Sequence, residues 1–149
     1  MMAAPSVGHV GLNVTDLARS RAFYAELLGL SVLAESEREG RRFALLGRGT
    51  DILVTLWEQA DAAFLARGAG LHHMSFGVGS LDEVREVERR ARRLGAPFLY
   101  EGVVPHAEGL DSGGVFFSDP DGIRLEVFAG AGAGAFAAPH MDGPSCGLF

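Results

Sequence analysis

Two adjacent histidines, His72 and His73, lie in the stretch GLHHMSFGV at residues 70–78. A second histidine-led stretch, HVGLNV at residues 9–14, aligns with it so that His9 matches His73. The residues after each histidine alternate between apolar and small or polar side chains, which is typical of a strand with one buried face. Two imidazoles at equivalent positions of a repeat are candidate metal ligands. His72 points the other way by strand alternation and is expected to be a supporting or structural residue.

One carboxylate stands out in the last apolar run, RLEVF, where Glu126 is flanked by Leu125 and Val127. Successive side chains of a strand point to opposite faces, so Glu126 is predicted to face away from these neighbours. An unpaired carboxylate on the inner face of a sheet would cost several kcal/mol unless a positive charge compensates it, and a divalent cation does so. Each of these residues taken alone is more often structural, but the coincidence of all three favours a metal site.

The elements that must position these residues repeat along the chain. Each histidine-led strand is followed by a capped amphipathic helix and then by three strand-like runs, so the pattern β-α-β-β-β occurs twice. We expect an α+β fold in which two βαβββ modules form an open, cup-shaped mixed β-barrel around the metal site. The chain is predicted to be a single domain over residues 1–149, with module one at 7–58, a linker at 59–70, module two at 71–129 and a small-residue tail at 130–149.

The runs behind the helices give the remaining strands of this prediction. They are LSVLAES (30–36), RRFALLG (41–47), DILVTLWE (51–58), APFLYEGV (96–103), GGVFFSD (113–119) and IRLEVFA (123–129). The composition of the tail predicts flexibility, although its Phe136, Leu148 and Phe149 are apolar enough to pack onto a neighbour or over a cleft.

Composition limits the classes of partner. The chain has 149 residues, a net charge of -6 and one cysteine, Cys146. The negative charge argues against nucleic-acid and anionic membrane surfaces, and no apolar run is long enough to span a bilayer. A single cysteine excludes an intrachain disulfide and a thiolate metal cluster. The N-terminus lacks the layout of a signal peptide, so we expect a cytoplasmic protein.

The stretches HVGLNVTDLARSRAFYAELLG, HHMSFGVGSLDEV and VFFSDPDGIRLEVF resemble the vicinal oxygen chelate superfamily of glyoxalases, bleomycin-resistance proteins and extradiol dioxygenases. The resemblance covers about residues 7–129, and its most specific element is FxDPDGxxLE. It implies that the first-strand histidine of each module and the last-strand glutamate bind a divalent metal. Those positions are His9, His73 and Glu126 in this chain.

Departures from individual family members narrow the expected activity. Glyoxalase I and the related epimerases have a fourth ligand, Glu or Gln, on the last strand of module one, where this chain is expected to have Val54. Fosfomycin-resistance transferases carry a Thr two residues after the first histidine, where this chain has Gly11. Drug-binding proteins of the bleomycin type usually lack the metal ligands that this chain keeps.

Two histidines and one carboxylate form a facial triad, which leaves three adjacent coordination positions open and suits non-haem Fe(II). We therefore predict an Fe(II)-dependent extradiol dioxygenase, with Mn(II) or another divalent metal as the alternative ion. Its substrates would be dioxygen and a small catechol, such as an L-DOPA-like compound of a natural-product pathway, as in the short branch of this superfamily. The alternatives are a metal-dependent lyase or transferase of the glyoxalase or fosfomycin-resistance type, and a drug-binding protein.

Ring cleavage needs an acid-base group beside the substrate. The first candidate is His106 in the loop VVPHAEGLDSGG, and the second is Tyr100. Larger extradiol enzymes usually show a Tyr at about the position of Phe117, so Tyr24, His140 or the tail stays open as another proton donor.

Other residues are candidates for the walls of the cup. The aromatic ones are Phe43, Trp57, Phe98, Phe116 and Phe128, and a substrate carboxylate would meet Arg41, Arg42 or Arg48. Open sheet edges need covering, so a homodimer is expected.

Overall fold

The computed structural model describes residues 1–149, apart from the side chain of Leu148. The chain divides into two compact units, Met1–Ala63 and Phe64–Phe149, and each is described by itself. The boundary lies within the predicted linker at 59–70, while the single domain expected over the whole chain stays a prediction. No helix in the described part of the chain is long and apolar enough to cross a membrane.

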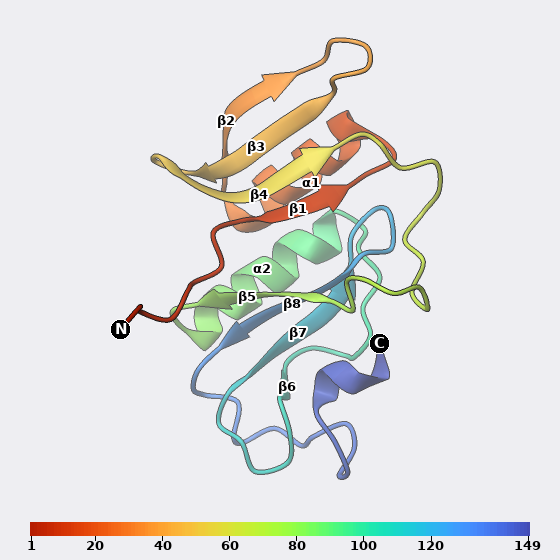
Figure 1. Ribbon diagram of the computed structural model, residues 1–149. Coiled ribbons are helices and arrows are strands. Elements are labelled where there is room, and N and C mark those ends of the chain that lie inside the picture. The colour runs from red at the N-terminus through yellow and green to blue at the C-terminus, as the bar shows by residue number, and fades with distance from the viewer. The chain divides into compact units, whose positions relative to one another are not determined.

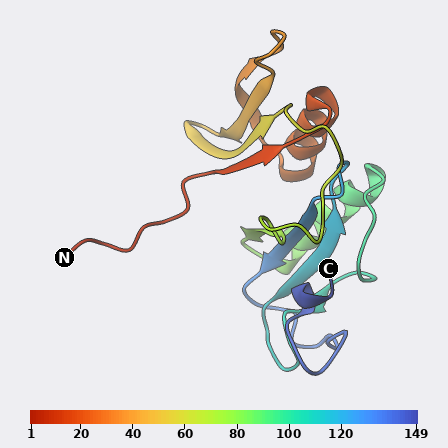
Figure 2. The same ribbon diagram turned by 45° about the vertical axis from the view of Figure 1, so that its right-hand side comes forward.

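The first unit is one βαβββ module (Figure 1). Its four-stranded sheet has the order β1-β4-β3-β2, in which β1 runs parallel to β4 and the other neighbours are antiparallel. The helix α1 lies on one face of this sheet in both ribbon views (Figures 1 and 2). The elements are β1 (Val10–Asn13), α1 (Leu17–Leu28), β2 (Ser31–Ser36), β3 (Phe43–Arg48) and β4 (Asp51–Trp57).

The second unit repeats this topology with the sheet order β5-β8-β7-β6, and β5 runs parallel to β8. The α+β class and the twofold βαβββ repeat are therefore confirmed, while the cup built from both sheets stays a prediction. The elements are β5 (Met74–Val78), α2 (Leu81–Arg93), β6 (Val104–Pro105), β7 (Gly113–Ser118), β8 (Arg124–Ala129) and the 3₁₀ helix η1 (Ser145–Leu148).

Both helices begin at a side-chain cap, as the repeated pattern predicts. The Asp16 side chain accepts a hydrogen bond from the Arg19 N–H and caps α1, and Ser80 caps α2 in the same way through the Glu83 N–H. Gly29 follows α1 with a φ of 62°, a left-handed conformation that glycine adopts without strain. These caps fix where each helix meets its sheet.

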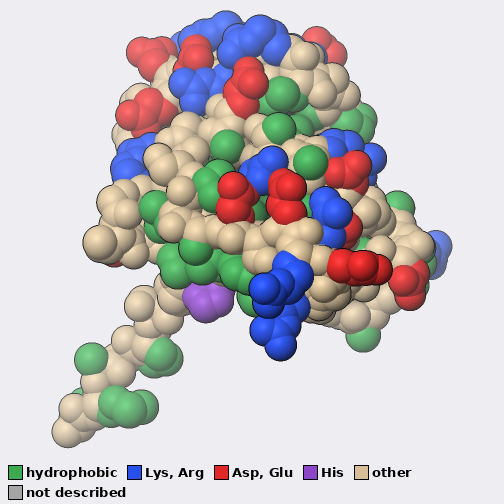
Figure 3. All heavy atoms as spheres, turned by 90° about the horizontal axis from the view of Figure 1, so that it is seen from above, with side chains coloured by type: hydrophobic (Ala, Val, Ile, Leu, Met, Phe, Trp, Pro, Cys, Tyr) green, Lys and Arg blue, Asp and Glu red, His purple; other side chains and the backbone are tan. Residues whose placement is uncertain are grey.

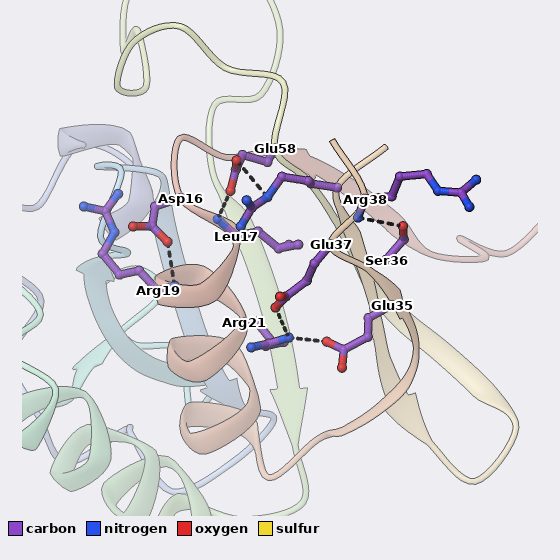
Figure 4. Close-up of polar contacts among 10 residues, drawn as sticks. Asp16, Leu17, Arg19, Arg21, Glu35, Ser36, Glu37, Arg38 and Glu58 are labelled. Atoms are coloured by element: carbon purple, nitrogen blue, oxygen red, sulfur yellow. Dashed lines mark hydrogen bonds and ion pairs between the residues drawn. The ribbon is translucent and has the colours of Figure 1, made fainter. Parts of the chain in front are cut away.

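Ion pairs cover the outer surfaces of both helices. Arg21 of α1 reaches Glu35 of β2 and Glu37 just beyond it (Figure 4). The arginines of α2 pair with acidic residues three or four positions away, as expected of a solvated face: Arg85–Asp82, Arg89–Glu86, Arg90–Glu86 and Arg92–Glu88. On the face drawn in Figure 3, basic and acidic side chains lie intermixed, without a broad area of one charge.

Each helix buries its apolar face against alternate residues of its own sheet. In the first unit these are Leu17, Phe23, Tyr24 and Leu27 of α1 and Ala44, Leu46, Val54 and Leu56 of the strands. In the second they are Val84, Val87 and Ala91 of α2 and Val115, Phe117, Leu125 and Val127 of the strands. The period of two along a strand then leaves the intervening side chains on the opposite face, where the candidate site lies.

One strand of module two differs from the prediction. The run at 96–103 is not a strand, apart from an isolated bridge between Phe98 and Phe117. The short β6 begins only at Val104 and pairs with Gly114. Proline at position 97 removes a ladder donor and Gly102 turns the chain with a φ of 72°, which explains why pairing is delayed.

The tail packs on the second unit, in contrast to the flexibility that its composition predicts. Ala133 is fully buried, and its N–H donates to the Asp111 carbonyl over 2.8 Å. The Ser145 N–H donates to the His106 carbonyl over 2.7 Å, and the Ser145 hydroxyl donates to the Pro105 carbonyl. These bonds hold η1 against the strand that precedes the His106 loop. Phe136 is partly exposed, and the side chain of Leu148 lies outside the described residues.

Candidate metal centre and active site

Glu126 is the buried carboxylate at the middle of β8. It pairs with Phe116 on β7 and Ser75 on β5, and the side chain is only 5% exposed. Its neighbours Leu125 and Val127 face the helix α2 with the unit's core, so Glu126 points to the opposite face, as the alternation predicts. A carboxylate at this depth needs polar or positive partners.

His73 immediately precedes β5 and supplies one of these partners. Its Nε2 lies 3.4 Å from Oε2 of Glu126, and its Nδ1 lies 2.8 Å from Nδ1 of His72. Burial lowers the pKa of His73 below its usual value, with the nearby Glu126 acting in the opposite direction. The neutral imidazole, which has a free nitrogen lone pair, is therefore favoured. His72 contacts the ring of His73 edge-on, which matches a supporting role.

His106, in the loop between β6 and β7, supplies the second partner. Its Nε2 lies within hydrogen-bonding distance of Oε1 of Glu126, and its Nδ1 lies 2.8 Å from the Ser112 hydroxyl. The ring also contacts Phe128, at 5.1 Å between centroids. Contacts on both nitrogens and with the Phe128 ring fix the orientation of this imidazole, although it lies in a loop.

Tyr100 serves the tail rather than the carboxylate. Its hydroxyl donates to the Ser145 carbonyl, and its ring meets Phe116 edge-on at 5.5 Å. Burial raises the pKa of Tyr100, with a further contribution from Cys146. The neutral hydroxyl is thereby kept as a donor to the tail. Of the two acid-base candidates, the structure places only His106 against Glu126.

The end of the tail covers His73. The Phe149 ring stacks on the His73 ring at 5.9 Å and contacts Phe116 at 5.8 Å, while the Arg124 guanidinium lies 5.7 Å from its centre. The apolar character of Phe149 predicts that it packs on a neighbour or over a cleft, but no sequence pattern identifies His73 as its partner. The role of Ser112 beside His106 likewise carries no sequence signal, because it depends on how the loop folds back.

His9 lies in the first unit, immediately before β1, where the residue is exposed. This is the position equivalent to His73, so its place in the repeat is as predicted. Among the described residues, no three His, Cys, Asp or Glu side chains form a group ready to hold a metal ion. The structure thus brings together two of the three predicted ligands, His73 and Glu126, and the ligand role of His9 stays a prediction.

The residues present at Glu126 fit a divalent cation of the first transition series. One buried carboxylate oxygen faces a neutral imidazole nitrogen, and nitrogen with carboxylate oxygen is the donor set of Fe(II), Mn(II) and Zn(II) sites. His72 and Ser112, on the other ring nitrogens of His73 and His106, provide the outer contacts that orient such imidazoles.

The register of the sheets corrects the predicted fourth position. Val10 and Met74 follow the two histidines and pair with Val54 and Leu125. The residue equivalent to Glu126 is therefore Thr55, one position later than Val54. Thr55 is buried, and its hydroxyl accepts a hydrogen bond from the Trp57 indole N–H over 3.0 Å. The equivalent position is polar rather than apolar, but it still carries no carboxylate or amide.

The aromatic candidates divide between the two faces of their sheets. Phe116 and Phe128 lie on the face of Glu126, and Phe43 and Trp57 lie on the face of the first sheet that points away from α1. The prediction for Phe98 was wrong. It packs on Phe117 and beneath the Arg92 guanidinium, at 4.2 Å, on the helix side.

Of the other proposed proton donors, Tyr24 belongs to the first unit and His140 to the tail. Tyr24 is fully buried in the core of the first unit, against Phe23. His140 forms an ion pair with Asp142, at 3.5 Å. Of the proposed proton donors, His106 is the one that contacts the Glu126 carboxylate in the described part of the chain.

Comparison with known proteins identifies the superfamily to which this fold is similar. The chain matches the Glyoxalase/Bleomycin resistance protein/Dioxygenase superfamily over residues 6–127. It is similar to a crystal structure of a glyoxylase/bleomycin resistance protein/dioxygenase domain from Frankia sp. EAN1pec, with 27% identity and a TM-score of 0.73. That similarity covers 86% of this chain and 99% of the other.

Two relatives of known activity are also similar. A lactoylglutathione lyase of Salmonella typhimurium is 30% identical over 135 residues, which cover 85% of this chain and 93% of the lyase. A catechol-2,3-dioxygenase of Bacillus subtilis is 28% identical over 126 residues, which cover 83% of this chain but only 41% of the dioxygenase. Because the superfamily match extends over both βαβββ modules, the chain belongs to the Glyoxalase/Bleomycin resistance protein/Dioxygenase superfamily.

Proposed function

We propose that this protein is a metal-dependent extradiol dioxygenase that cleaves a small catechol. The observation that carries the proposal is the buried Glu126 carboxylate, with the imidazoles of His73 and His106 at its two oxygens. Proteins of this superfamily bind divalent metal ions, manganese among them, and include a catechol dioxygenase. The proposed ion is Fe(II), held by His9, His73 and Glu126.

Each side chain has a separate task in this proposal. His73 and Glu126 bind the metal, with His9 as the third ligand. Bound Fe(II) would supply chelation of both catechol oxygens and activation of dioxygen. The fixed ring of His106 presents Nε2 toward Glu126. This nitrogen would accept the proton of a catechol hydroxyl once Glu126 turns its oxygens to the metal and no longer accepts from it. Phe116 and Phe128 give the substrate ring apolar surroundings.

A metal-dependent lyase is the second candidate. It is favoured by the lactoylglutathione lyase, which resembles this chain over nearly its whole length, whereas the similarity covers less than half of the catechol dioxygenase. The residue equivalent to Glu126 argues against it, because Thr55 cannot supply the carboxylate or amide ligand expected of glyoxalases. A drug-binding protein without a metal would not need the buried Glu126.

An oxygen electrode with a panel of catechols separates these activities. The purified protein is loaded with Fe(II) under anaerobic conditions and mixed with catechol, 3-substituted catechols or L-DOPA. We expect one dioxygen consumed per catechol and a yellow ring-opened product that forms only in air. Conversion of a hemithioacetal in the absence of dioxygen, with Mn, Ni or Zn as the bound metal, would establish the lyase instead. Metal-free protein that binds unsubstituted catechol with the same affinity after Glu126 is replaced by Gln would establish the drug-binding alternative.

The cytoplasmic location and the homodimer belong to the same proposal. Sedimentation of the purified protein at micromolar concentration tests the dimer, and a single species at the mass of one chain would contradict it.

A further inference from the structure

A hollow of about 800 Å³ opens in the first unit, where β3 begins and β4 ends, beside the loop between β2 and β3. It has no residue in common with the Glu126 cluster. Trp57, on its wall, pairs with Asn13, whereas His9 precedes the other end of β1. Asn13 lies four positions after His9 along an extended chain, which is roughly 13 Å. The lining residues are Glu37, Glu39, Gly40, Arg41, Arg42, Phe43, Trp57, Glu58 and Gln59.

The apolar wall of this hollow is an aromatic pair. Phe43 and Trp57 occupy paired positions on β3 and β4, and their rings lie 5.3 Å apart at an angle of 33°. The hydrogen bond from the Trp57 indole to Thr55 holds the larger ring in place. Trp57 nevertheless remains 38% exposed, so its ring is open to a ligand. Such a surface favours another planar ring.

Most charges around the hollow neutralise one another. Glu58 forms an ion pair with Nε of Arg42 at 3.0 Å and accepts a hydrogen bond from the Leu17 N–H (Figure 4). Glu37 pairs with Arg21 of the helix α1 (Figure 4). These contacts neutralise Glu58 and Arg42, whereas Glu37 shares Arg21 with Glu35 and keeps part of its negative charge.

Two charged side chains on the wall remain. Neither the Arg41 guanidinium nor the Glu39 carboxylate has an ion pair or a side-chain hydrogen bond within the described part of the chain. They flank Gly40, whose φ of 75° makes the turn between them. A ligand that satisfied both would carry an anion and a cation close together. Arg48, the third arginine that the sequence offered for a carboxylate, does not line the hollow.

We propose that this hollow binds a small aromatic zwitterion, such as an aromatic amino acid. The ring of the ligand stacks on Phe43 and Trp57, the carboxylate pairs with Arg41, and the ammonium group pairs with Glu39. The sequence makes Phe43, Trp57 and Arg41 candidates for contacts with the catechol substrate, whereas the hollow that they line contains no proposed metal ligand. The site therefore goes beyond the proposed dioxygenase activity and does not require it.

Fluorescence tests the proposal directly, because Trp57 is the only tryptophan of the chain. Metal-free protein is titrated with L-phenylalanine, 3-phenylpropionate and phenethylamine, none of which absorbs the exciting light at 295 nm. We expect L-phenylalanine to shift the Trp57 emission at the lowest concentration. Each analogue with a single charge should bind about threefold to fivefold more weakly, as exposed ion pairs contribute. Equal binding of the three, or no emission change, would overturn the proposal.

Substitutions assign each charge. Arg41→Gln should make L-phenylalanine bind no better than phenethylamine, and Glu39→Gln should make it bind no better than 3-phenylpropionate. Both side chains are exposed on a turn, so unfolding temperatures should stay unchanged. Arg48→Gln is the matched control, and an equal loss in this variant would show that nonspecific charge effects explain the binding. The Glu126→Gln variant should bind the amino acid normally, which separates this site from the metal centre.

Discussion

The two βαβββ modules share a topology but differ in what they carry on the face opposite the helix. In the second module the middle of the last strand carries Glu126, with imidazoles at both carboxylate oxygens. In the first, the equivalent position is Thr55, whose hydroxyl accepts from Trp57. The scaffold therefore determines where a functional side chain can lie, and single residues at equivalent positions determine the chemistry of each module.

Separate substitutions at the two equivalent positions test this difference between the modules most directly. Glu126→Gln keeps the shape of the side chain but removes the charge, so bound metal and kcat/KM for the catechol should fall at least ~100-fold. Thr55→Val should change both by less than about threefold. Metal analysis and oxygen-electrode kinetics measure this difference, and similar losses in the two variants would mean that the modules contribute equally.

The role of His106 gives the next largest effect. His106→Gln removes the proton acceptor but not a metal ligand, so kcat should fall about 100-fold while the metal content stays the same. Ser112→Ala, which only frees Nδ1, should lower kcat by less. If metal is lost together with His106, this residue is itself a ligand, and the triad with His9 is wrong.

The tail, which has no counterpart in the first module, should shield Cys146. Burial raises the pKa of the Cys146 thiol, with Glu126 nearby contributing in the same direction. The reactive thiolate is therefore scarce near neutral pH, and labelling by a disulfide reagent at pH 8 should be slower than that of free cysteine. Tyr100→Phe removes the hydrogen bond to Ser145 and should speed labelling about tenfold. An unchanged rate would show that this bond does not hold the tail.

The helix caps give the smallest expected effect. Asp16→Ala removes the side-chain cap of α1 and should lower the free energy of unfolding by about 1 kcal/mol. Ser80→Ala should cost less, because Glu83 still accepts a hydrogen bond from the Gly79 N–H at 2.7 Å. Urea denaturation measures both free energies of unfolding. A larger decrease for Ser80→Ala than for Asp16→Ala would mean that the hydrogen bond between Gly79 and Glu83 contributes little.

Much of the fold could be predicted, because its local patterns agree with its long-range pairing. Asp16, Ser80 and Gly29 mark the ends of the helices, and apolar alternation marks seven of the strands. The run at 96–103 was wrongly predicted to be a strand, because its apolar residues lie in an extended connection that forms only an isolated bridge with β7. Val54 and Thr55 were confused because a shift of one residue exchanges the two faces of a strand.

The candidate site was only partly predictable. Glu126 could be recognised because a carboxylate between buried residues is costly, and His73 because it repeats His9. No local pattern distinguishes His106 from Tyr100. Both lie in irregular segments, and their contacts with Glu126 and Ser145 span 20 and 45 residues of sequence. Phe149 is farther still from His73 in the sequence, and only the folded tail brings the two rings together.

The contact between Phe149 and His73 has a practical consequence for anyone who produces this protein. A tag or fusion partner attached after residue 149 would begin beside the imidazole and would crowd it. Residues 1–8 are exposed and precede β1, so an affinity tag is better attached at that end, separated from His9 by a cleavable spacer.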